Sequence, residues 1–221
     1  YASPSAQQSF TTFIKQVRSH IDQHQLGTLT IDSSPSDLIK QRLIDLQTVQ
    51  PYVDSVVLMT YDYHYMGSQV TGPVAPSFGA GTESEFDVEV GIQKALEVLP
   101  KEKTILGIPL YGYRWESLTH NPRSATMPGS GVVVTNRFME EFIEKCATCS
   151  PQLDQNAQEK YITYEDERGT IYQAFYPDID FMQDKINLAH QYHLDGVALW
   201  AIGYEGETML EPLKDYIHTI E

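Results

Sequence analysis

The stretch Ser55-Val-Val-Leu-Met-Thr-Tyr-Asp-Tyr-His64 begins as a short apolar run and ends in phenols and a carboxylate. The apolar residues are typical of a buried β-strand, whose carboxyl end would carry the side chains of Met59, Tyr61 and Asp62. In parallel α/β proteins, ligands bind at the carboxyl ends of the strands. The stretch therefore predicts both a fold class and the position of a site.

Helical and strand-like patterns alternate on both sides of this stretch. Strand-like segments are expected at residues 27–32, 55–60, 103–110 and 196–200. Apolar residues at helical spacing lie between and around them, and predict helices at 5–23, along Ile39, Leu43 and Leu46, and at 88–99, 178–192 and 208–220. This order predicts an α/β fold with a parallel sheet that is buried on both faces.

The interval between residues 110 and 196 is longer than one crossover helix needs. It contains a helical apolar face that ends at Cys146, and two strand-like runs at 161–165 and 170–176. The runs flank Asp166-Glu-Arg-Gly169, which is typical of a hairpin turn. We therefore expect the main domain to comprise residues 1–115 and 177–221, and an α+β insertion subdomain to comprise residues 116–176.

Composition restricts the class of protein. The chain has 221 residues, of which 41% are hydrophobic and 20% are charged, as expected for one globular domain with a small insertion. No apolar run reaches membrane-spanning length. The opening Tyr1-Ala-Ser-Pro4 has neither an initiator Met nor the pattern of a cleavable signal, so we expect the chain to be cut from a longer one. The net charge of −15 disfavours nucleic acid and anionic membranes as partners and is compatible with a neutral ligand.

The cysteines and histidines form no recognisable metal motif. Cys146 and Cys149 are a Cys-x-x-Cys pair, but two further zinc ligands at suitable spacing and the preceding strand of a redox motif are both missing from the pattern. A local disulfide and two inert thiols both remain compatible with the pair. His20 and His24 lie four residues apart on an expected helix, where a solvated helix end is the better interpretation. We expect no metal and no cofactor.

Aromatic and polar side chains follow three of the expected strands. They are Met59, Tyr61 and Asp62 after the second, Tyr111, Arg114 and Trp115 after the third, and Trp200, Tyr204 and Glu205 after the fourth. Aromatic rings with a few polar groups bind the apolar faces of sugars, whose hydroxyl groups pair at the rim. The pattern predicts a carbohydrate site, although each residue alone could be structural, with the aromatics at the core edge and Asp62 capping a turn.

Four motifs resemble those of family 18 glycoside hydrolases, the chitinase-like enzymes. They are Met59-Thr-Tyr-Asp62, Gly72-Pro-x-Ala-Pro76, Gly107-Ile-Pro-Leu-Tyr-Gly112 and Asp195-Gly-Val-Ala-Leu-Trp200. The resemblance covers nearly the whole chain and implies strands five to eight, the carboxyl-terminal half of a TIM (β/α)8 barrel, with the insertion after the seventh strand. Tyr113 stands where the common chitinase form has Arg, so the chain is more similar to the bacterial branch associated with spore cortex and peptidoglycan.

The resemblance also implies a reaction on glycans that contain N-acetylglucosamine, either chitin or peptidoglycan. In this family the acetamido oxygen of the substrate attacks the anomeric carbon, and one protein acid protonates the departing oxygen. The matched positions imply that Tyr61 donates to the acetamido oxygen and that Asp62 binds the sugar and tunes the acid. Met59 would pack near the acetamido methyl group, and Trp200 would form the floor of the central subsite. The other substrate-binding residues would be Tyr111, Arg114 and Trp115.

The family's acid belongs to an Asp-x-x-Asp-x-Asp-x-Glu motif, which residues 1–221 do not contain. Asp32 is an alternative, but its strand corresponds to the fifth of the barrel and no acid two residues earlier supports it. We therefore expect this polypeptide alone to hydrolyse nothing. Half a barrel would leave two strand edges unpaired, so we expect either a homodimer or a missing amino-terminal half.

Three classes of function follow from these patterns. The first is part of a chitinase-like glycosidase, the second is a non-catalytic chitin- or peptidoglycan-binding protein on the same barrel, and the third is an α/β scaffold whose aromatic residues are structural. The implied substrate predicts an extracellular or cell-wall location.

Overall fold

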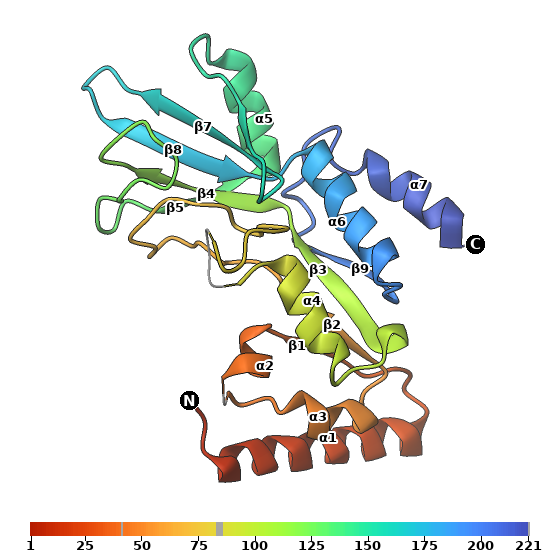
Figure 1. Ribbon diagram of the computed structural model, residues 1–221. Coiled ribbons are helices and arrows are strands. Elements are labelled where there is room, and N and C mark those ends of the chain that lie inside the picture. The colour runs from red at the N-terminus through yellow and green to blue at the C-terminus, as the bar shows by residue number, and fades with distance from the viewer. Residues whose placement is uncertain (41, 83–85, 221) are drawn as a thin grey trace. The chain divides into compact units, whose positions relative to one another are not determined.

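Figure 1 shows the computed structural model of the chain, which describes residues 1–40, 42–82 and 86–220, with side chains described as far as residue 216. The chain divides into two compact units. The first unit comprises residues 1–60, 89–107 and 189–198, and the second comprises the remainder. Within the described residues, no helix is both long and apolar enough to cross a membrane.

The predicted parallel sheet is confirmed. Its strand order is β1-β2-β3-β9, where the strands are β1 (Thr30–Ser33), β2 (Ser55–Leu58), β3 (Thr104–Pro109) and β9 (Gly196–Trp200). β1 and β2 run parallel with Thr30 opposite Ser55, and β2 and β3 run parallel with Val56 opposite Thr104. The sheet therefore brings together segments that are far apart in the sequence.

The first unit is built around β2. Val56 and Leu58 of β2 are fully buried and pack in one cluster with residues of α1 (Pro4–His24), α3 (Leu46–Val49) and α4 (Val88–Leu96). α1 matches the predicted helix, and it begins where the Ser3 hydroxyl accepts a hydrogen bond from the Ala6 N–H, an N-cap that stabilises the first turn. His20 and His24 are both exposed near its end.

The predicted helix that carries Ile39, Leu43 and Leu46 on one face is wrong. Two short helices take its place, α2 (Ser36–Ile39) and α3, followed by the 3₁₀ turn η1 (Gln50–Tyr52). Leu46 is buried, whereas the side chains of Ile39 and Leu43 are 38% and 46% exposed. The helical spacing of these three apolar residues therefore does not correspond to one buried helix face.

The second unit contains an antiparallel sheet with strand order β5-β4-β8-β7-β6. The strands are β4 (Tyr111–Glu116), β5 (Val132–Thr135), β6 (Gln152–Asp154), β7 (Glu159–Glu165) and β8 (Ile171–Tyr176). The predicted hairpin is confirmed as β7 and β8, and the predicted helix as α5 (Asn136–Lys145), which lies along the sheet in Figure 1. β4 contains residues 111–115, which the sequence assigned to the end of a main-domain strand. The bounds 116–176 of the insertion subdomain stay a prediction.

Three further elements remain to be described. The predicted helices near the carboxyl end are α6 (Ile179–Gln191) and α7 (Glu211–Ile220), and the short turn η2 (Lys101–Lys103) precedes β3 in the first unit. Met209 and Tyr216 are buried. A disulfide joins Cys146 to Cys149 directly after α5, which decides between the two states that the sequence allowed.

Candidate active site

Asp62 lies in an unusual stretch of backbone after β2. Its φ is 62°, in the left-handed region that most residues with a side chain avoid and that Asp tolerates better than most. The residue is exposed and belongs to the second unit. A conformation of this kind persists only where the surroundings hold it, which makes the Asp62 turn a candidate functional element.

Two phenols hold the Asp62 carboxylate. The hydroxyl groups of Tyr111 and Tyr113 each donate to Asp62 Oδ1 at 2.7 Å. Burial raises the pKa of both phenols above the ordinary value, and the hydrogen bonds to Asp62 raise it further. Both phenols therefore stay protonated over the physiological pH range, and they act as permanent donors that fix the orientation of the carboxylate.

Aromatic rings surround this carboxylate. Tyr111 packs edge-on against Tyr61, Tyr113 and Tyr204, with ring centroids 6.3, 5.6 and 6.3 Å apart. Edge-to-face contacts of this geometry are favourable and fix the relative orientation of the rings. The structure therefore brings together three residues that the sequence singled out, Tyr61, Asp62 and Tyr111.

Tyr113 was noticed in the sequence only as a departure from the family pattern. It belongs to the site because residues 111 and 113 are two apart on β4 and so project from the same face of the strand. The signal that could have found it was this alternation, once residues 111–116 are recognised as a strand. The hydroxyl of Tyr113 makes a bond to Asp62 at the position where the common chitinase form has Arg.

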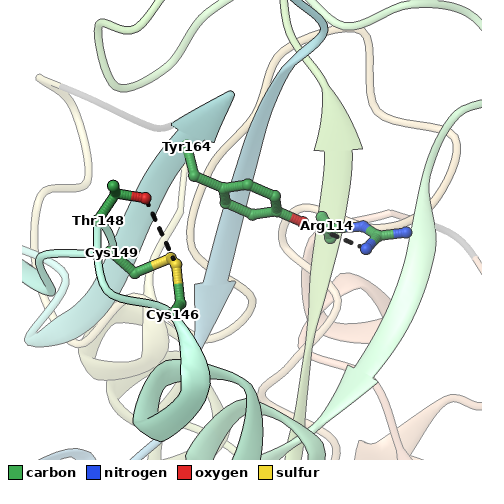
Figure 2. Close-up of a disulfide and its surroundings, with 5 residues drawn as sticks. All are labelled: Arg114, Cys146, Thr148, Cys149 and Tyr164. Carbon is green, nitrogen blue, oxygen red and sulfur yellow. Dashed lines mark hydrogen bonds between the residues drawn. A yellow bond between two sulfur atoms is a disulfide. The ribbon is translucent and has the colours of Figure 1, made fainter. Parts of the chain in front are cut away.

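Arg114 projects from the opposite face of β4. Its guanidinium donates to the Tyr164 hydroxyl at 3.2 Å, as Figure 2 shows, and lies 5.1 Å from the centre of the Tyr172 ring. Arg114 and Tyr111 therefore lie on opposite faces of β4, because successive residues of a strand alternate between its faces. A substrate-binding role for Arg114 stays a prediction.

Trp115 is on the same face as Tyr113 but is 1% exposed. Its indole N–H donates to the backbone oxygen of Tyr65 at 3.1 Å, and its ring packs 5.8 Å from that of Tyr113. In this structure the ring supports Tyr113 from within the core instead of offering a surface to a ligand.

Trp200 and Met59 differ in their surroundings. The Trp200 side chain is 57% exposed, and its backbone oxygen accepts a hydrogen bond from the Leu110 N–H at 2.7 Å. Met59 belongs to the first unit, is half-buried, and donates its N–H to the Ser33 oxygen. Trp200 thus offers a large ring to solvent from a backbone that is hydrogen-bonded to the residue directly after β3. A sugar-stacking role for this ring stays a prediction.

The described residues contain no group of three or more His, Cys, Asp or Glu side chains that could hold a metal ion. A fixed carboxylate, phenol donors and aromatic rings can hydrogen-bond the hydroxyl or amide groups of a ligand and pack on its apolar faces.

The fold and the site define an α/β protein with an aromatic, carboxylate-bearing site of the kind that binds sugars. The particular family follows from comparison with known proteins. The glycosyl hydrolases family 18 matches residues 1–205, and the chain belongs to this family. The resemblance drawn from the four motifs is confirmed.

Individual relatives agree with this assignment. The cortical fragment-lytic enzyme of Bacillus subtilis is 26% identical over 212 residues, which are 92% of this chain and 44% of that protein. The Group IV chitinase of Ostrinia furnacalis, solved in complex with allosamidin, shares the fold with a TM-score of 0.86 and 22% identity, over 99% of this chain and 64% of that one. The spore cortex-lytic enzyme SleL of Bacillus megaterium gives a TM-score of 0.77 and 20% identity, over 96% and 46%. The chain spans less than half of both bacterial relatives.

Proposed function

We propose that residues 1–221 are the carboxyl-terminal half, strands five to eight, of the catalytic barrel of a glycosidase that acts on glycans containing N-acetylglucosamine. Two observations support the choice of a half barrel: the parallel sheet has four strands with β1 and β9 at its edges, and the chain spans 44% of the cortical fragment-lytic enzyme. A closed barrel of this type needs eight strands.

The observation that carries the proposed chemistry is the fixed carboxylate of Asp62 between Tyr111 and Tyr113, with Tyr61 beside them. In substrate-assisted retaining hydrolysis, the acetamido oxygen of the sugar attacks the anomeric carbon, so the protein must orient that group and stabilise the charge it develops. In our proposal Tyr61 donates to the acetamido oxygen, and Asp62 binds the sugar and supports the acid. Met59 and Trp200 pack against the acetamido group and the ring.

The acid itself is proposed to lie outside residues 1–221. No Asp-x-x-Asp-x-Asp-x-Glu occurs in this sequence, so we expect the isolated chain to leave chitooligosaccharides and peptidoglycan intact. The test is to incubate purified residues 1–221 with each glycan and to measure released sugars by chromatography. Release of N-acetylglucosamine above that of a heat-denatured sample would overturn this part of the proposal.

A second test concerns the edges of the sheet. Unpaired strand edges favour association, so we propose that the isolated chain forms a homodimer and that in the natural protein an amino-terminal half covers the same edges. Light scattering of the purified chain gives its mass directly. A stable monomer would exclude the dimer, and addition of an amino-terminal half expressed separately would then test the second arrangement by a shift to the summed mass.

The substrate could be chitin or peptidoglycan, and the rates at which the natural protein hydrolyses the two can be compared directly. Relatives named for chitin and for spore cortex both match the chain, and Tyr113 occupies the position where the common chitinase form has Arg. We propose peptidoglycan as the substrate because the bond from Tyr113 to Asp62 departs from the chitinase pattern at the site itself. Equal or faster turnover of chitooligosaccharide than of spore peptidoglycan by the natural protein would reverse this choice.

We propose an extracellular or cell-wall location. The disulfide between Cys146 and Cys149 supports it, since disulfides persist in oxidising compartments. Alkylation of the native protein followed by mass spectrometry checks this, because two alkylated cysteines would indicate a reducing compartment.

A second candidate function is carbohydrate binding without catalysis. The absence of the acidic motif from the sequence favours it, whereas the supporting groups Tyr61, Asp62 and Trp200 fit both candidates. Glycan binding with no turnover by the natural protein would select this candidate. A natural protein that neither binds nor hydrolyses glycans would indicate that the aromatic residues are structural.

A further inference from the structure

A fully buried carboxylate lies at the first position of β7, in the second unit. Glu159 has no solvent exposure, and its two oxygens accept hydrogen bonds from the backbone N–H groups of Val74 and Ala75 at 3.0 and 3.1 Å. A carboxylate without such partners would be costly to bury. Glu159 has no part in the roles proposed above, yet it holds the Gly72–Pro76 loop from one side.

The other side of the same loop holds the residues that follow Asp62. The Val74 oxygen accepts a hydrogen bond from the Tyr63 N–H at 3.0 Å, and the Pro73 oxygen accepts one from His64 Nδ1 at 2.9 Å. Residues 73–75 therefore form a bridge, with donors directed to Glu159 and acceptors directed to residues 63 and 64. Tyr63 follows Asp62 directly in the chain, so the bridge restrains the residue next to it. The left-handed backbone of Asp62 needs such support from its surroundings.

The buried Lys185 acts electrostatically on Glu159. Lys185 of α6 is 1% exposed, donates to the Ser77 hydroxyl and lies 3.2 Å from Asp184 Oδ2. Burial raises the pKa of Glu159 to about 7, while the two N–H groups and the charge of Lys185 act in the opposite direction. The charge of Asp154 in β6 also acts on Glu159 and raises its pKa.

We propose that Glu159 is a positioning residue of the glycan site, which holds the Asp62 turn in place through the Gly72–Pro76 loop. It touches no substrate itself. Replacement of one carboxylate oxygen by an NH₂ group removes an acceptor, so Val74 or Ala75 loses its partner and the bridge to Tyr63 loosens. The glycan consequence of this inference rests on the proposed function, whereas its structural consequence does not.

The structural test uses hydrogen exchange on the natural protein that contains residues 1–221. We expect Glu159→Gln to speed amide exchange in peptides that cover residues 61–65 and 72–76, by about tenfold, the factor expected when one hydrogen bond to a charged group is lost. Glu167→Gln is the matched control, because Glu167 is exposed in the β7–β8 turn. Unchanged exchange in both peptides would overturn the inference, whatever the protein does with glycans.

The same segment provides a test that needs no variant. Above pH about 7 the Glu159 carboxylate accepts both N–H groups, whereas below it the protonated form offers one acceptor fewer. After correction for intrinsic exchange, peptides 61–65 and 72–76 should be better protected at pH 8 than at pH 6 in the parent protein, and equally protected at both in Glu159→Gln. His64 faces the same loop, but burial lowers its pKa, and it is present in both proteins. Equal protection at pH 6 and pH 8 in the parent protein, together with unchanged exchange in Glu159→Gln, would overturn the inference.

Glycan binding distinguishes this inference from the proposed function. With chitotetraose as the probe, Glu159→Gln should bind about tenfold more weakly than the parent at pH 8, with less difference at pH 6. A parent protein that binds neither chitotetraose nor spore peptidoglycan would refute the proposed function and leave hydrogen exchange to decide the role of Glu159. A parent that binds while Glu159→Gln binds equally well at pH 8 would refute the positioning role.

Discussion

On one face of β4, Tyr111 and Tyr113 direct their hydroxyl groups at Asp62, whereas on the other face Arg114 donates to Tyr164 and lies over Tyr172. The second face also approaches α5, whose end carries the disulfide between Cys146 and Cys149 (Figure 2). Both faces combine a charged group with phenols, but in our proposal only the first contacts the glycan. Neighbours in a sequence motif are therefore not neighbours in a site when the motif forms a strand.

The largest effect is expected from replacing Asp62, the carboxylate that the first face of β4 holds. In the natural protein, Asp62→Ala should reduce hydrolysis by about 100-fold, the loss typical of removing one charge-stabilising group from an active site. Turnover of spore peptidoglycan measures it. The control is Asp32→Ala, at an exposed acid in the first unit, which should change turnover little. A larger loss from Asp32→Ala than from Asp62→Ala would contradict the assignment of the site.

Trp200 tests whether an exposed ring near the first face contributes binding. Trp200→Ala should weaken chitotetraose binding by about tenfold, because aromatic stacking and buried apolar area are lost. Calorimetric titration gives the dissociation constant. Ile202→Ala is the control, since Ile202 is 90% exposed and two residues away. Equal affinity of Trp200→Ala and the parent would favour a purely structural role for the aromatic residues.

Matched removals of one hydroxyl compare the two faces directly. Tyr113→Phe takes one donor from Asp62 and should weaken glycan binding by about fivefold, less than the loss of a hydrogen bond to a charged group alone would give, because Tyr111 still donates to Asp62. Tyr164→Phe takes the acceptor from Arg114 and should leave binding unchanged. Because burial and Asp62 keep the pKa of Tyr113 above its ordinary value, the difference should persist from pH 6 to pH 9. Equal losses in the two variants would show that both faces serve the ligand.

The smallest effect on binding is expected at the disulfide. Replacement of Cys146 and Cys149 by Ser should lower the free energy of unfolding by about 2 kcal/mol or less, because the loop that the disulfide closes is short. Urea unfolding measures this. Chitotetraose affinity should equal that of the parent. A clear loss of affinity would mean that a change near the second face of β4 alters the binding residues on the first.

Local patterns predicted much of this fold. Apolar runs identified β2, β3 and β9, as is typical of strands in a parallel sheet. The expected burial on both faces holds only for β3, since β2 alternates buried and half-buried residues and β9 is half-buried apart from its exposed last residue. The same reasoning failed between Ile39 and Leu46, where apolar spacing matched a helix that the chain does not form. Spacing reports a possible buried face, and whether that face is buried depends on what packs against it.

The sequence by itself determined the family, the order of the strands along the chain and the presence of an aromatic, carboxylate-bearing site, since these follow from motifs and local periodicity. The tertiary structure alone decided the partners of each side chain: Tyr113 rather than Arg114 beside Asp62, Trp115 in the core, and Glu159 beneath the Gly72–Pro76 loop. Glu159 and Val74 are far apart in the sequence, so no local pattern records their contact. Hydrogen bonds of this kind depend on how distant segments pack, and only the folded chain specifies them.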